Sequence, residues 1–156
     1  MKTFKKILAA TDLSPESLSA VSYAGHLACA QGSSLVVLHV AHSTTVLFTE
    51  FVPGIDVTAI DEEIEMAARD RLESWAKRHL HKVEDLELIV RRGMVPETIC
   101  ELAAETGASI IIMATHGRTG VGRMVLGSVT EKTLARAPCP VLVLRPPDPV
   151  GEAEAG

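Results

Sequence analysis

The sequence predicts an α/β fold, a single doubly wound open sheet of five parallel strands with a Rossmann-like arrangement. Short apolar segments that suit buried strands alternate along the chain with longer segments that have helical apolar periodicity. The central strand is expected around Ile110 to Met113, which contains three adjacent isoleucines. A continuous apolar run of this kind is typical of a strand buried on both faces of a parallel sheet.

The first strand is predicted at Lys6 to Thr11, and a helix follows from Pro15 towards Gly32. Ser14 suits the N-cap of this helix, and Pro15 suits its first turn, where a backbone N–H would lack a partner anyway. The second strand is predicted at Leu35 to Val40, with His39 as a core histidine whose hydrogen bonds are satisfied. The first helix has apolar residues at helical spacing: Leu18, Val21, Ala24 and Ala28.

The second half of the chain repeats this alternation after an irregular connection, Ala41 to Ile55. The third strand is predicted at Leu86 to Val90, a helix with Pro96 in its first turn ends at Gly107, and the last strand is Val141 to Leu144. A long amphipathic helix precedes the third strand, and its expected buried stripe is Ile60, Ile64, Ala67, Ala68, Leu72 and Trp75.

The composition favours one domain, residues 1–145, followed by a polar tail, residues 146–156. A chain of 156 residues with 47% hydrophobic content can bury a full core. The net charge of -5, the scattered basic residues and the 3% aromatic content argue against a nucleic-acid partner. No apolar run is long enough for a membrane span, so we expect no membrane partner. The three cysteines lack C-x-x-C spacing, which is consistent with a reducing cytoplasm.

A glycine-rich loop follows the central strand and leads into the last helix. Three glycines lie within Gly117 to Gly122, and Gly127 precedes Ser128 to Glu131, a capping-box pattern with Ser128 as the expected N-cap. Glycine backbone and the unpaired N–H groups of a helix start can hold a phosphate. The alternative is a loop that binds nothing. The Walker lysine and a G-x-G-x-x-G run are both absent, which disfavours a P-loop NTPase and a Rossmann dehydrogenase.

This loop and its flanks, Met113 to Gly120 and Gly127 to Glu131, resemble the universal stress protein family. ATP-binding members of that family carry glycine, two residues, glycine, nine residues, and then Gly-Ser or Gly-Thr. Here Ala114 stands at the first glycine, Gly117 at the second, and Gly127 with Ser128 closes the pattern. The methyl group of Ala114 could crowd the ribose or phosphates of a nucleotide. It would also be unfavourable if the backbone at that position required a positive φ.

The resemblance implies the strand order 3-2-1-4-5 and a crevice between the first and fourth strands, where ligands of such sheets bind. It implies ATP or AMP as the ligand, with Val40 presenting its backbone to adenine. Mg or Mn is possible on the phosphates, with Asp12 as a metal ligand; on residue type alone, Asp12 suits a turn before Ser14 better. The expected cofactor-binding residues are Ala10, Thr11, Asp12, Val40, Met113, Ala114, His116, Gly117, Arg118, Gly120, Gly127, Ser128, Val129 and Thr130.

The expected function is therefore nucleotide binding in stress response or signalling. In the implied order Val141 to Leu144 is an open apolar sheet edge, and a homodimer through this strand is expected, as is common in the family. The alternative is a scaffold of the same fold, or a binder of a small apolar ligand, that takes no nucleotide. A slow ATPase is the third possibility, although the sequence offers no Walker lysine, paired carboxylates or general base.

Overall fold

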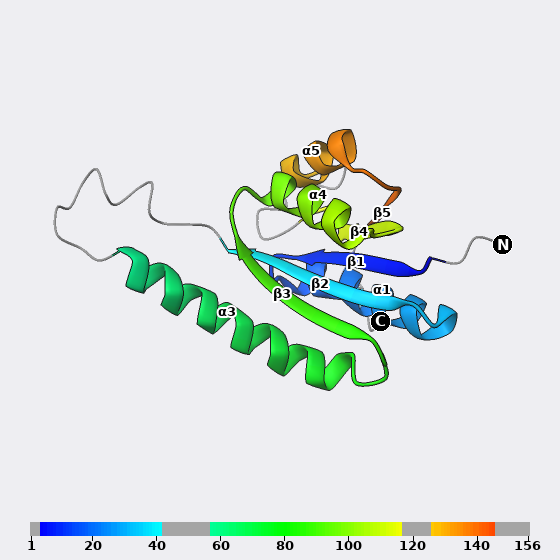
Figure 1. The fold of residues 1–156 in the computed structure, drawn as a ribbon, viewed down its shortest axis with the longest axis horizontal. Helices are drawn as coiled ribbons and strands as arrows, with labels where there is room; N and C mark the ends of the chain where they lie inside the picture. Colours follow the sequence, from blue (N-terminus) through cyan, green and yellow to red (C-terminus); the bar gives the residue numbers. More distant parts are fainter. Residues whose placement is uncertain (1–3, 42–56, 117–125, 146–156) are drawn as a thin grey trace, which may run out of the picture.

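The computed structural model describes residues 4–41, 57–116 and 126–145 (Figure 1). In these residues five parallel strands form one sheet in the order β3-β2-β1-β4-β5, which confirms the predicted fold and strand order. The order places β1 and β4 side by side at the centre, and it makes β3 and β5 the two edges. The strands are β1 Lys6–Thr11, β2 Ser34–Ala41, β3 Leu86–Arg92, β4 Ile110–Ala114 and β5 Val141–Leu144.

Helices cover both faces of the sheet (Figure 1). Because successive side chains of a strand point to opposite faces, Ile7 packs with α1 and α3, whereas Leu8 packs with α4. Leu72 of α3 and Leu102 of α4 are fully buried or nearly so on the two sides. The helices of the described residues are α1 Pro15–Gln31, α3 Val57–His79, α4 Val95–Thr106 and α5 Ser128–Arg136. None of them is long and apolar enough to cross a bilayer.

The boundaries of α1 and α4 agree with the sequence prediction. The Ser14 side chain accepts a hydrogen bond from the Ser17 N–H at 3.2 Å, with Pro15 in the first turn. Gly32 and Gly107 close the two helices, each at φ 65°, where a side chain would be strained.

The start of α5 differs from the prediction. The N-cap is Gly127, Ser128 is the first helical residue, and the Gly127 carbonyl accepts the Glu131 N–H at 3.0 Å. No side chain caps this end, so the predicted capping role of Ser128 is wrong.

The predicted buried stripe of α3 holds only for the C-terminal part of the helix. Ala68 and Leu72 are buried and Trp75 is half-buried. Ala67 is exposed, and Ile60 and Ile64 are 42% and 39% exposed. Figure 1 shows why: the first turns of α3 reach past the carboxyl ends of β2 and β3, so no sheet lies beneath them. The predicted connection, residues 41–55, lies outside the described residues from residue 42 onward, and so does the predicted tail, residues 146–156.

Candidate functional site

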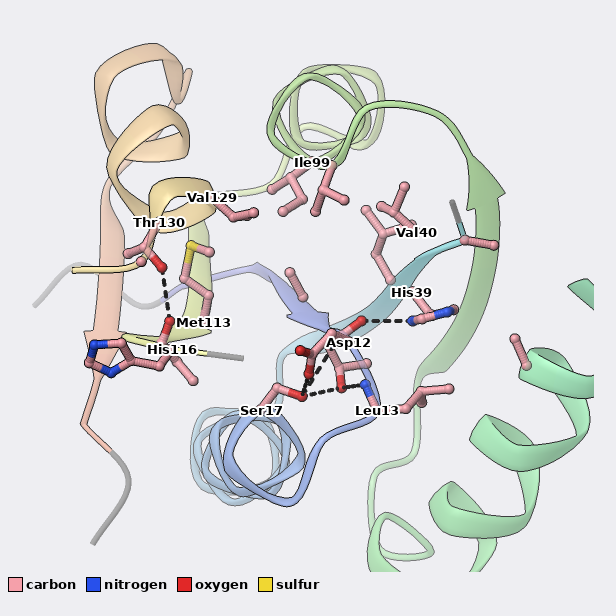
Figure 2. Close-up of a pocket in the computed structure, with 18 of the residues that line it drawn as sticks. Asp12, Leu13, Ser17, His39, Val40, Ile99, Met113, His116, Val129 and Thr130 are labelled. Atoms are coloured by element: carbon pink, nitrogen blue, oxygen red, sulfur yellow. Dashed lines mark hydrogen bonds between the residues drawn. The ribbon is translucent and has the colours of Figure 1, made fainter. Parts of the chain in front are cut away.

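A cavity of about 700 Å³ opens at the carboxyl ends of β1, β2 and β4 (Figure 2), at the predicted crevice. Its volume is within the range that small-molecule sites occupy. It brings together Ala10, Thr11, Asp12, Val40, Met113, Ala114, His116, Gly127, Ser128, Val129 and Thr130. The other three expected residues, Gly117, Arg118 and Gly120, lie outside the described residues.

One wall of the cavity is apolar. Leu38 and Val40 of β2, Ile99 of α4, Met113 of β4 and Val129 of α5 line it. Figure 2 shows the last four of these side chains gathered on the α4 and α5 side, across from the turn that carries Asp12. A flat apolar group, such as a purine ring, would bury its faces well against this wall.

The N-terminus of α5 opens into the same cavity. The Gly127 N–H is already used, since it donates to the Thr115 carbonyl at 2.9 Å. The N–H groups of the next three residues, Ser128, Val129 and Thr130, have no acceptor within the described part of the chain, as expected for the first turn of a helix. We call these three N–H groups the α5 amides. Together with the helix dipole they favour an anion at this end.

Gly127 and Thr130 fix the start of α5 to the end of β4. Gly127 has φ -62°, so its backbone does not require glycine, but an added Cβ would lie 3.1 Å from the Thr115 carbonyl oxygen. The buried Thr130 hydroxyl donates to the carbonyl groups of Ala114 at 3.1 Å and Thr115 at 3.3 Å. The Thr130 hydroxyl proton is therefore committed to the scaffold, and only its main-chain N–H is left for a ligand.

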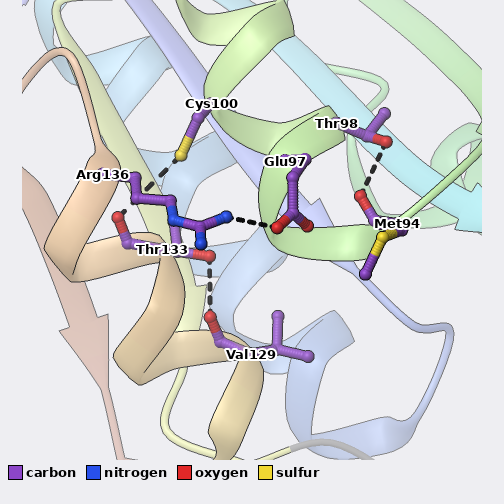
Figure 3. A network of polar contacts seen from close by, with 7 residues as sticks. All are labelled: Met94, Glu97, Thr98, Cys100, Val129, Thr133 and Arg136. Atoms are coloured by element: carbon purple, nitrogen blue, oxygen red, sulfur yellow. Dashed lines mark hydrogen bonds and ion pairs between the residues drawn. The ribbon is translucent and has the colours of Figure 1, made fainter.

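The position of α5 is also fixed by α4 (Figure 3). Glu97 in the first turn of α4 pairs with Arg136 in the last turn of α5. Nearby, the Cys100 thiol donates weakly to the Thr133 carbonyl at 3.9 Å, and the Thr133 side chain is fully buried. The Glu97 carboxyl has a lowered pKa, first because its own backbone N–H donates to it and then because of Arg136.

Ala114, at the position of the first motif glycine, imposes no backbone strain. It pairs with Leu144 of β5 as a regular strand residue, and its φ is not positive. Its methyl group packs in the buried cluster under α1 and α3. Among the described residues, Leu13 is the one non-glycine residue with a positive φ, at 64°.

Asp12 lies in the turn between β1 and α1, and its carboxylate serves the turn itself. Its Oδ1 accepts from the Ser14 N–H at 3.0 Å and from the Ser17 hydroxyl at 2.7 Å. This is the turn role that the residue type alone suggested. The start of α1 therefore already holds an anion of its own, and α5 supplies the helix start that a ligand phosphate can use.

The Val40 carbonyl faces the gap that opens where β1 ends. Ser34 donates towards β1 and Leu35 towards β3, so the even-numbered residues of β2 direct their peptide groups at β1. The β1–β2 pairing stops at Thr11 with His39. The next donor along the chain, the Leu13 N–H, goes to the Thr11 hydroxyl at 2.9 Å instead. No residue in the described ranges therefore donates to the Val40 carbonyl.

His39 and Arg71 are among the cavity-lining residues that the sequence did not indicate as site residues. His39 is half-buried, and its Nδ1 donates to the Thr11 carbonyl at 2.9 Å, so it is hydrogen-bonded as expected but lies at the site. Arg71 of α3 donates from Nη2 to the Leu13 carbonyl at 3.0 Å. Neither residue belongs to a sequence motif, since one is a single histidine in an apolar strand and the other an arginine on a helix surface. The position of His39 next to Val40 is the one sequence feature that indicates it.

The described residues contain no group of three or more histidine, cysteine, aspartate or glutamate side chains placed to hold a metal ion. A divalent cation in this cavity would depend on oxygen atoms supplied by the ligand. Mg²⁺ is commonly bound in this way, by one or two carboxylates together with substrate phosphates.

Comparison with known sequences identifies the relatives of this chain. The model of the universal stress protein family matches residues 3–145. The universal stress protein YxiE of Bacillus subtilis is 32% identical over 147 residues, which cover 91% of this chain and 99% of that protein. The universal stress protein A homolog 1 of Coxiella burnetii is 34% identical over 142 residues, with coverage of 90% and 96%.

Solved structures show the same fold. The protein MJ0577 superimposes with a TM-score of 0.79 at 28% identity, covering 92% of this chain and 97% of its own. Its sequence comes from Methanocaldococcus jannaschii. A universal stress protein in complex with cAMP superimposes with a TM-score of 0.61 at 22% identity, covering 92% of this chain and 98% of its own.

Proposed function

Since this chain belongs to the universal stress protein family, we propose that it binds an adenine nucleotide, ATP or AMP, and reports its occupancy in stress response or signalling. One observation carries the proposal: the residues that bear the α5 amides and the Val40 carbonyl line one cavity with an apolar wall. A nucleotide presents the matching groups, because its phosphate accepts hydrogen bonds and its adenine donates through the 6-amino group.

The phosphate end is matched by the start of α5. The α5 amides supply three main-chain donors, and the helix dipole adds roughly half a positive charge at that end. Each hydrogen bond to a charged group is worth about 1.5 to 3 kcal/mol. A ligand without an anionic group would gain much less from this arrangement, because hydrogen bonds to neutral acceptors are weaker.

The base end is matched by the apolar wall and the Val40 carbonyl. Purine faces would lie between Ile99, Met113 and Val129, where contact removes apolar surface from water. The 6-amino group of adenine would donate to the Val40 carbonyl, which otherwise stays without a donor in the described chain. The cAMP complex of a protein with this fold supports the choice of an adenine nucleotide.

A Mg²⁺ or Mn²⁺ ion would accompany ATP rather than occupy a site of its own. Asp12 is the carboxylate that lines the cavity, and it fits the single protein ligand that such an ion commonly takes beside phosphates. The ion would neutralise phosphate charge near this carboxylate. Slow ATP hydrolysis is the weaker form of the proposal, since the described lining residues include no second carboxylate to act with Asp12.

The sheet edge at β5 supports a homodimer as part of the proposal. All four residues of β5 are half-buried, and β4 is the one strand paired with β5 in the described sheet. An apolar edge of this kind pairs readily with the same strand of a second copy. We place the protein in the cytoplasm, because its three cysteines are all free thiols.

Calorimetry with ATP, AMP and adenosine tests the proposed function. We expect saturable binding of both nucleotides and markedly weaker binding of adenosine, because adenosine cannot use the α5 amides. Equal binding of all three would contradict the phosphate contact. Binding of small apolar compounds without any nucleotide binding would favour the alternative, since Ile64 and Ala68 of α3 extend the apolar lining on the other side.

A further inference from the structure

We propose that Thr11 and Arg71 are positioning residues that keep the Val40 carbonyl available to the base, and so give the site its preference for adenine. This inference rests on the proposed function and explains how that site would choose its base. It concerns the single turn at Leu13, where the chain leaves β1 for α1. Both main-chain polar groups of Leu13 are held there by side chains.

If the β1–β2 pairing continued regularly, the Val40 carbonyl would accept a hydrogen bond from the main chain that follows β1. In the β1–β2 ladder, alternate N–H groups of β1 donate to alternate carbonyl groups of β2, with Thr11 opposite His39 as the last pair. The next hydrogen bond of this ladder would join the Leu13 N–H to the Val40 carbonyl. The base would then meet an acceptor that is already occupied.

The Thr11 hydroxyl prevents this hydrogen bond by accepting the Leu13 N–H itself. It accepts the Leu13 N–H at 2.9 Å and lies 2.8 Å from the Ser17 hydroxyl. The Ser17 hydroxyl has the Asp12 carboxylate as an acceptor at 2.7 Å and the Ser14 carbonyl as a second acceptor at 3.1 Å, so we assign the Thr11 hydroxyl as the donor to Ser17. The resulting chain of hydrogen bonds has one consistent direction, from the Leu13 N–H to the carboxylate, and such chains strengthen each bond in them.

Arg71 holds the carbonyl group of Leu13. Its Nη2 donates to the Leu13 carbonyl at 3.0 Å from a helix 58 positions away in the sequence. The neighbouring Leu72 is fully buried, which anchors this part of α3. The Leu13 side chain is 3% exposed, and its φ of 64° turns the chain away from the sheet. A residue with a branched apolar side chain keeps this conformation only where its surroundings hold it.

The consequence can be measured as a choice between two bases. Adenine carries a 6-amino donor, whereas hypoxanthine carries a 6-oxo acceptor that would face the Val40 carbonyl without a proton between them. A site with an open carbonyl therefore prefers AMP to IMP. When the Leu13 N–H takes the Val40 carbonyl, the two nucleotides lose this difference, although the α5 amides still hold both phosphates.

The test is the ratio of IMP to AMP dissociation constants, measured by calorimetry. For the wild type we expect a ratio of about tenfold or more, which corresponds to one hydrogen bond gained against one unpaired acceptor. Thr11→Val and Arg71→Ala lower this ratio towards one, mainly by weakening the binding of AMP. Thr11→Ser and Arg71→Lys, which keep a hydroxyl and a donor, restore it. Arg69→Ala, on an exposed position of the same helix outside the cavity lining, serves as the control and keeps the wild-type ratio.

The two proposals fail in different ways in this experiment. A wild type that binds neither AMP nor IMP overturns the proposed function and this inference with it. A wild type that binds both equally overturns this inference alone. Variants that lose AMP and IMP binding to the same extent show a merely structural role and also overturn it. Arg71 is exposed, so its variants are expected to fold even where Thr11→Val does not.

Discussion

Replacing Ser128 by proline removes one of the α5 amides while leaving the helix geometry intact. Ser128 is the first helical residue, a position where proline fits, because the N–H that it lacks has no partner within the helix. The residue before it, Gly127, has φ -62° and ψ 151°, the extended conformation that a residue before proline adopts. The protein already contains this arrangement at Ser14, with φ -72° and ψ 154°, before Pro15.

The expected loss follows from a single hydrogen bond. A hydrogen bond to a charged acceptor contributes about 1.5 to 3 kcal/mol, and each 1.4 kcal/mol corresponds to a tenfold change in affinity. Ser128→Pro should therefore raise the dissociation constant of AMP about ten- to hundredfold. Ser128→Ala keeps the N–H and loses the exposed hydroxyl, and it should change the affinity much less. Adenosine, which has no phosphate, should bind to all three proteins alike.

Calorimetry gives the affinities, and thermal unfolding checks the fold. The unfolding midpoint of Ser128→Pro should stay close to that of Ser128→Ala. A folded Ser128→Pro protein that binds AMP as tightly as the wild type would refute the phosphate site at α5. An equal loss of affinity for adenosine would also refute it, because the substitution would then act on binding of the base rather than of the phosphate.

Three other outcomes follow from the structure. Thr130→Val should lower the free energy of unfolding in urea by about 1 to 3 kcal/mol, because the buried Ala114 carbonyl loses its donor; an unchanged midpoint would contradict this. The lowered pKa of Glu97 means that the stabilising effect of its charged form is present above the ordinary value of 4.5 and is lost as pH falls through the folded-state pKa. Glu97→Gln should reduce the acid sensitivity of the melting temperature, and unaltered sensitivity would argue against the pair with Arg136. Val143→Glu should convert the proposed dimer to a monomer in sedimentation, and a dimer that survives would exclude the β5 edge.

The fold was predictable because its signals are local. Buried strands such as Ile110–Ala114 are continuous apolar runs, and helix ends such as Gly107 need a left-handed residue that the sequence shows as glycine. The strand order came from the family resemblance, since periodicity alone does not say which strands pair. Amphipathic spacing also marked Ile60 and Ile64 as buried, but it carries no information on where the sheet beneath a helix ends.

The location of the cavity was predictable from the sequence, but the main-chain donors and acceptors around it were less so. The capping-box pattern placed the cap at Ser128, whereas close contact between Gly127 and Thr115 moves the start of the helix by one residue. That contact joins residues twelve positions apart and leaves no local sequence pattern. The open Val40 carbonyl and the Arg71 contact to Leu13 depend on where β1 stops and on how α3 crosses it, which only the assembled structure shows.

The most direct test of the account is whether a nucleotide phosphate contacts the α5 amides. Amide chemical shifts of ¹⁵N-labelled protein, followed during titration with AMP and separately with adenosine, report on each N–H group. We expect the amides of Ser128, Val129 and Thr130 to shift strongly with AMP and little with adenosine. Saturation with AMP that leaves these three amides unmoved would contradict the account, whatever the affinity.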